Sequence, residues 1–123
     1  MELLSIQDQI QLKMEELAED KRWEFITLFS SEGLPMASYG QSTLYDQDEL
    51  LEFSYKLIEI LPLLKECLPV QHILIDSNQG KAMVFRFLTI NSMQLTLAAI
   101  VDKHTACRRN LNRLIQYIND LLS

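Results

Sequence analysis

Residues 25–40 read FITLFSSEGLPMASYG, and this stretch predicts a β-hairpin. Its first run is rich in β-branched and aromatic residues. It ends in a short polar segment closed by Gly33, a residue that can adopt the positive φ of a bulged turn. The second run carries Pro35, whose nitrogen has no hydrogen to donate to a neighbouring strand. We therefore expect the second strand of the hairpin, residues 34–39, to lie at the edge of a sheet.

A segment with helical periodicity lies at each end of the chain. The first, residues 5–20, opens with Ser5 and Asp8 at the spacing of a capping box. Its apolar residues at helical spacing are Ile6, Ile10, Met14 and Leu17. Those of the last segment are Leu111, Leu114, Ile115, Ile118, Leu121 and Leu122. Each set forms one face, so we expect two amphipathic helices.

The middle segment, residues 46–68, predicts a helix with two apolar stripes. The first stripe is Leu50, Phe53, Leu57, Leu61, Leu64 and Leu68. The second is Leu51, Tyr55 and Ile58. Together they span about 200° of the helix at 100° per residue, roughly twice what a one-sided core requires. We expect Asp46 or Asp48 to cap this helix and Pro62 to kink or end it.

Three runs between the middle and last helices, VQHILIDS, KAMVFRFLTI and MQLTLAAIV, predict strands. Several of their positions are apolar on both alternating faces, as expected when helices cover both sides of a sheet. The expected order is α-β-β-α-β-β-β-α. The expected fold class is α/β (α+β), a five-stranded antiparallel sheet sandwiched by helices, in a single domain over residues 1–123.

Composition narrows the class of partner. The chain carries 17 acidic and 11 basic residues, a net charge of −6, which argues against nucleic acid. No apolar run reaches the roughly 18 residues that cross a bilayer, and the N-terminal residues do not resemble a signal peptide. We therefore expect a cytoplasmic protein with no membrane insertion, in which Cys67 and Cys107 are free thiols.

The sequence holds no convincing catalytic motif. Gly80 and Lys81 resemble the end of a phosphate-binding loop, but Ile75 and Ala82 stand where that motif needs glycine and a hydroxyl residue. His104 and Cys107 are spaced to share a helical face, yet too few further ligands accompany them for zinc. We expect no catalytic residue, no cofactor and no metal.

The motif and the element order together resemble the Roadblock family, which is related to dynein light chains. The motif residues are Glu32, Gly33, Leu34, Pro35, Met36, Ala37 and Ser38. The resemblance covers nearly the whole chain. It implies that two copies pair through the second helix and the third strand, which joins their sheets into one. A helix with two apolar faces suits such a homodimer.

We expect the dimer interface at Leu51, Tyr55, Ile58, Gln71, Ile73 and Ile75. The resemblance also implies a non-enzymatic binding module that regulates or docks a small Ras-like GTPase. The expected partner surface is Glu49, Glu52, Lys56 and Glu59.

Two other functions remain open. One is a scaffold or adaptor subunit of the light-chain type, which joins a larger complex without acting on a nucleotide cycle. The other is a small-ligand sensor, although bulky aromatic residues favour a filled core. The basic group Lys103, Arg108, Arg109 and Arg113 is either a solvated face or a contact for an acidic partner.

Overall fold

Eight elements follow one another in the order expected from the sequence. The computed structural model describes residues 5–30, 32–41, 46–65, 72–76, 80–102 and 107–122. The helices are α1 (Ile6–Lys21), α2 (Gln47–Lys65) and α3 (Arg108–Leu122). The strands are β1 (Phe25–Ser30), β2 (Pro35–Gly40), β3 (His72–Asp76), β4 (Lys81–Ile90) and β5 (Met93–Asp102).

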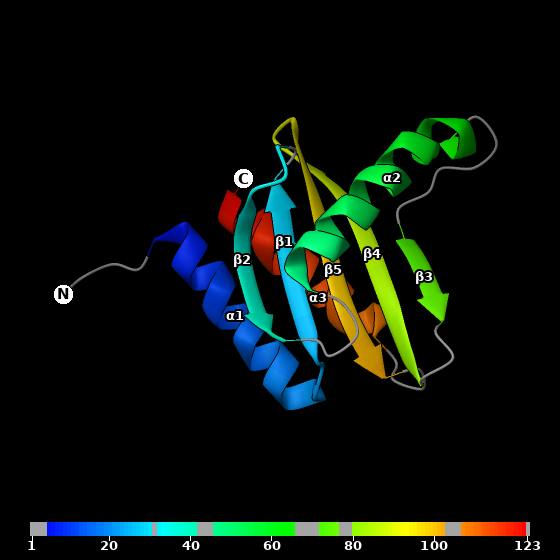
Figure 1. Ribbon diagram of the computed structural model, residues 1–123. Coiled ribbons are helices and arrows are strands. Elements are labelled where there is room, and N and C mark those ends of the chain that lie inside the picture. The colour runs from blue at the N-terminus through cyan, green and yellow to red at the C-terminus, as the bar shows by residue number, and fades with distance from the viewer. Residues whose placement is uncertain are drawn as a thin grey trace.

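The five strands form one antiparallel sheet in the order β2-β1-β5-β4-β3. Helix α2 crosses one face of this sheet, and α1 and α3 lie against the other (Figure 1). The predicted α+β sandwich is therefore confirmed. Strand β2 lies at an edge, as Pro35 predicted, and β3 lies at the opposite edge.

The core on the α1 and α3 side is built from every second residue of the central strands. Ile26, Val84 and Leu97 belong to it, together with the buried faces of both helices. In α1 the fully buried residues are Ile10, Met14 and Ala18, four apart, whereas Ile6 is 44% exposed and Leu17 only partly buried. The buried face of α1 thus continues through Ala18, four residues after Met14, rather than through Leu17.

The core on the α2 side is aromatic. Phe25, Phe29 and Phe85 are buried beneath the helix, and Leu50 of α2 is buried among them. The ring of Phe53 stacks on Phe85 with centroids 5.6 Å apart. One helix with large side chains covers this face, whereas two helices share the other.

Helix α2 begins as predicted and ends later than Pro62. The Oδ1 atom of Asp46 accepts a hydrogen bond from the backbone N–H of Glu49 at 2.8 Å, so Asp46 is the capping residue. The helix continues to Lys65, so the expectation that Pro62 ends it is wrong, and the alternative that Pro62 kinks it stays a prediction. Proline removes one helical hydrogen bond and its ring crowds the carbonyl four residues earlier, yet the helix passes through it. Cys67 lies outside the described residues, and Cys107 is a buried free thiol.

The β1–β2 turn approaches α2 at Gly33. Gly33 has φ +82° and donates its N–H to the carbonyl oxygen of Ser30 at 3.0 Å. A Cβ atom on Gly33 would lie 1.7 Å from the hydroxyl oxygen of Tyr55 in α2. The glycine of the motif therefore suits the positive φ of the turn and leaves room for the hydroxyl end of Tyr55.

We expect Gly33→Ala to destabilise the protein more than Gly80→Ala. Both glycines have positive φ, so both variants carry the left-handed backbone cost of about 1–2 kcal/mol, but nothing lies within 4 Å of a Cβ at Gly80. Only Gly33→Ala also displaces Tyr55, and the measurement is urea unfolding of the two variants side by side.

The control is a Tyr55→Ala background, in which the excess cost of Gly33→Ala should disappear. Equal costs for the two glycine variants in the wild-type background would contradict the coupling between the turn and α2.

Candidate protein–protein interface

Strand β3 has an open outer edge. Its five residues pair with β4 from His72 opposite Arg86 to Asp76 opposite Ala82, and within the described part of the chain nothing pairs with its other side. Ile73 and Ile75 face α2 and are partly buried in the aromatic core. Leu74 faces the opposite way and is 48% exposed. An unpaired edge beside exposed apolar surface is a template for another strand.

The outward face of α2 is charged along its middle. Glu49, Glu52, Lys56 and Glu59 are all exposed. The Nζ atom of Lys56 lies 3.8 Å from Oε1 of Glu52, and both side chains are about 70% exposed, so this ion pair adds little stability. Three of these four predicted partner residues surround a hollow of about 180 Å³. Its lining is Glu49, Leu50, Glu52, Phe53, Lys56 and Met83.

The two flanks of α2 face opposite ends of the sheet. Tyr55 is 41% exposed and lies against Gly33 in the β1–β2 turn. Phe53 lies on the other flank, stacked on Phe85 of β4 next to the open edge strand. Ile60, seven residues after Phe53, shares that second flank and is 46% exposed. The apolar surface beside β3 is therefore the Phe53 and Ile60 flank.

The residues predicted for a dimer interface are thus divided between two places. Ile73 and Ile75 lie on the edge strand, whereas Tyr55 lies on the far flank of α2 and Leu51 packs partly buried against the aromatic core. Gln71 and the side chain of Ile58 lie outside the described residues. The interface itself stays a prediction.

Two exposed residues beside the edge strand, Leu74 and Ile60, were missed. The alternation of VQHILIDS indicated that Leu74 and Ile73 point to opposite faces. The sequence does not show which face of the edge strand a helix covers.

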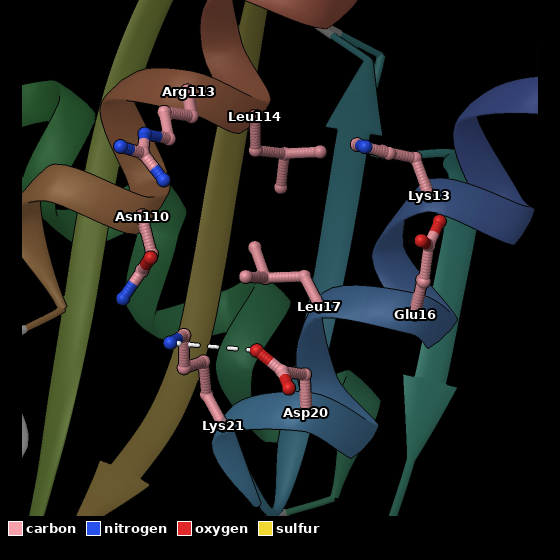
Figure 2. A pocket seen from close by; sticks show the side chains of 8 residues that line it. All are labelled: Lys13, Glu16, Leu17, Asp20, Lys21, Asn110, Arg113 and Leu114. Atoms are coloured by element: carbon pink, nitrogen blue, oxygen red, sulfur yellow. Dashed lines mark ion pairs between the residues drawn. The ribbon is translucent and has the colours of Figure 1, made fainter.

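A groove runs between α1 and α3 on the other side of the molecule (Figure 2). It encloses about 310 Å³, and Leu17 and Leu114 point toward each other across it. Charges of both signs line it: Lys13, Glu16, Asp20, Lys21 and Arg113. The Oδ2 atom of Asp20 and the Nζ atom of Lys21 lie 3.4 Å apart and form an ion pair.

The predicted basic group is only partly at this groove. Arg113 lines it, Arg108 and Arg109 are exposed at the start of α3, and Lys103 lies outside the described residues.

Two further findings concern binding chemistry. No group of three or more histidine, cysteine, aspartate or glutamate side chains gathers to hold a metal within the described ranges, and His104 is outside them. The same ranges contain no helix that is long and apolar enough to span a bilayer.

Comparison with known proteins identifies the fold. No family model and no curated protein matches the sequence. Among solved structures, MglB of Myxococcus xanthus is similar with a TM-score of 0.70 and 15% identity, over 99% of this chain and 90% of that one. A structure titled MglB with tetrameric arrangement is similar with a TM-score of 0.77 and 10% identity, over 99% and 93%.

A Roadblock/LC7 domain from Streptomyces avermitilis is also similar, with a TM-score of 0.66 and 11% identity, over 89% of this chain and 91% of that one. Identities this low establish the fold alone. The expected resemblance is confirmed at that level: the chain has the fold of MglB and of the Roadblock/LC7 domain.

Proposed function

We propose that this protein is a non-enzymatic homodimeric binding module that docks or regulates a small Ras-like GTPase. The observation that carries the proposal is an open edge strand next to an exposed apolar helix flank, in a chain with the Roadblock/LC7 fold. The resemblance to the Roadblock family supplies the class of partner, and the geometry supports the surfaces.

Self-pairing of β3 would satisfy the open edge. Two copies related by a twofold axis bring their β3 edges together antiparallel, and each copy then covers the same patch of the other. The outward backbone groups of β3 gain partners, and the exposed side chains of Leu74 and Ile60 lie next to the new contact. A similar structure titled MglB with tetrameric arrangement supports self-association of this fold.

The α2 flank that joins such an interface is the one beside β3, with Phe53 and Ile60. A dimer through Leu51, Tyr55 and Ile58 would instead place the twofold axis near the β1–β2 turn, away from β3. We favour the first arrangement because it buries the helix flank and the strand edge in one continuous patch.

The partner surface is the charged middle of α2. Glu49, Glu52 and Glu59 outnumber Lys56, so the partner we expect is basic where it docks. The hollow beside Glu49 and Glu52 is also lined by Phe53 and Met83. A docking segment could therefore make apolar contacts there next to two carboxylates. Binding that differs between the two nucleotide states of a GTPase would shift its populations.

A scaffold subunit is the second candidate. The groove between α1 and α3 favours it, because this groove offers a second surface on the face of the sheet opposite α2 (Figure 1). A chain with contact surfaces on both faces can join two larger proteins without acting on a nucleotide.

We expect light scattering of the wild-type chain at micromolar concentration to give twice its 14.3 kDa mass. Ile60→Glu should give monomers, since a carboxylate in a tightly packed apolar contact weakens association by about 100-fold. The matched control is Leu12→Glu on α1, where the replaced side chain is 50% exposed and lies away from β3; it should remain dimeric.

Tyr55→Glu distinguishes the two arrangements of the dimer. It should remain dimeric if β3 and the Phe53 flank form the interface. Dissociation by Tyr55→Glu with Ile60→Glu still dimeric would place the contact on the other flank, and a monomeric wild type would contradict the dimer.

We expect this protein to change nucleotide release or hydrolysis by a small Ras-like GTPase isolated with it from native lysate. Glu52→Lys should weaken binding at least about tenfold by placing like charges at the contact, whereas Glu16→Lys on α1 should not. Both glutamates are exposed on helices, so both variants should fold. Stable co-purification with a large partner, insensitive to GTP or GDP, would instead support the scaffold.

A further inference from the structure

Arg86 of β4 is a half-buried cation without a carboxylate partner in the described part of the chain. It points to the α3 side of the sheet, where its Nη1 donates a hydrogen bond to Oδ1 of Asn112 at 2.7 Å. Its Nε is fully buried and has no hydrogen-bond partner among the described residues. A guanidinium has five N–H donors, and the contact with a neutral amide leaves its charge uncompensated.

Two more basic side chains surround the same place. His72 of β3 lies directly opposite Arg86, and its Nδ1 is also buried without a partner. Burial lowers the pKa of His72, and the charges of Arg86 and of Arg108 at the start of α3 lower it further. Burial and the nearby Arg108 likewise lower the pKa of Arg86, whereas the neighbouring Cys107 raises it. Positive charge therefore accumulates at this corner from Arg86 of β4 and Arg108 of α3, whereas the lowered pKa of His72 favours its neutral form.

At the other end of β4, carboxylates of the same chain neutralise a cation. Lys81 opens β4 and has two carboxylates within reach, Asp102 at 2.6 Å and Glu24 at 3.6 Å. No such pair is present at Arg86 within the described ranges. Among the described residues, Arg86 is therefore a cation whose charge a bound anion could neutralise.

A hollow of about 250 Å³ opens beside Arg86 between β4 and α3. Its polar lining is Arg86, Thr89, Asn112, Gln116 and Asn119. None of the lining residues is a carboxylate; the nearest acid along α3, Asp120, accepts a hydrogen bond from Gln116 at 2.9 Å. Because Asn112 uses its Oδ1 for Arg86, its amide N–H groups remain as donors.

We propose that this hollow binds a small oxyanion, inorganic phosphate or a phosphate monoester, on the guanidinium of Arg86 with Asn112 as a second donor. Arginine suits phosphate because its planar fork matches two oxygens at once, and charge-assisted hydrogen bonds are about twice as strong as neutral ones. The positive charge of Arg108 adds to the attraction. The site lies on the α3 side of the sheet, opposite the proposed GTPase surface on α2, and its neighbour His72 belongs to β3, the strand of the proposed dimer contact.

The test is titration of the wild-type protein with inorganic phosphate against chloride at matched ionic strength, followed by calorimetry. Phosphate should bind saturably at one site per chain, and Arg86→Gln should weaken it about tenfold or more. The matched control is Arg109→Gln, an exposed arginine of α3 outside the hollow, which should leave the affinity unchanged. Glycerol 3-phosphate separates the two ligands: tighter binding than phosphate identifies a monoester site.

A second readout needs no variant at Arg86. A bound dianion offsets the charges of Arg86 and Arg108 that face His72 from β4 and α3, so phosphate should raise the pKa of His72. Proton NMR follows its imidazole, which is assigned by its loss in His72→Gln. Absence of saturable binding, equal effects of Arg86→Gln and Arg109→Gln, or an unmoved His72 pKa under saturating phosphate would each overturn the proposal.

Stability in phosphate-free buffer should also depend on His72. Its pKa is lowered in the fold, so protonation costs more in the folded chain than in the unfolded one. The free energy of unfolding should therefore fall as the pH drops below the ordinary histidine value of about 6.5, until the lower folded-state pKa is passed. Urea unfolding at pH values from about 7.5 to about 5, which bracket the ordinary histidine pKa, measures this slope.

His72→Gln should flatten this slope, and added phosphate should do the same in the wild type. A slope that His72→Gln leaves intact would assign the pH dependence to another group.

Discussion

The structure depends on a sheet whose central strands are apolar on both faces. Ile26, Val84 and Leu97 point to one side, and Phe25, Phe85 and Ile100 point to the other. Buried apolar surface contributes roughly 25 cal/mol per Å², so neither face can remain in water. Two helices cover the first face and one helix covers the second. That asymmetry is the source of the surfaces that we assign to function.

A single helix over five strands leaves the ends of its face thinly covered. At one end Tyr55 reaches the β1–β2 turn, where only a glycine leaves it room. At the other end Ile73 and Ile75 of β3 are only partly buried beside α2. The turn motif and the open edge strand are thus two consequences of one helix position. The motif closes one end within the chain, and the other end is the one that we propose a second copy covers.

Much of this arrangement could be predicted from local chemistry. Pro35 indicated an edge strand, Asp46 a helix cap and the double stripe of α2 an incompletely buried helix. These features depend on residues near one another in the sequence. Ala18 was missed as a core residue because its burial depends on how α1 meets the sheet. The contact between Tyr55 and Gly33 and that between Arg86 and Asn112 were missed because each joins segments that only the tertiary fold brings together.

The same distinction explains why charge was harder to interpret than hydrophobicity. Apolar periodicity depends only on whether each side chain is buried or exposed, so an apolar stripe at helical spacing identifies a covered face. A cation has a role only in relation to its neighbours. Lys81 and Arg86 lie on one strand, yet two carboxylates neutralise the first, whereas among the described residues a neutral amide accepts the hydrogen bond of the second. Because burying an unpaired charge is costly, the fold retains Arg86 at an expense in stability that a bound anion would offset.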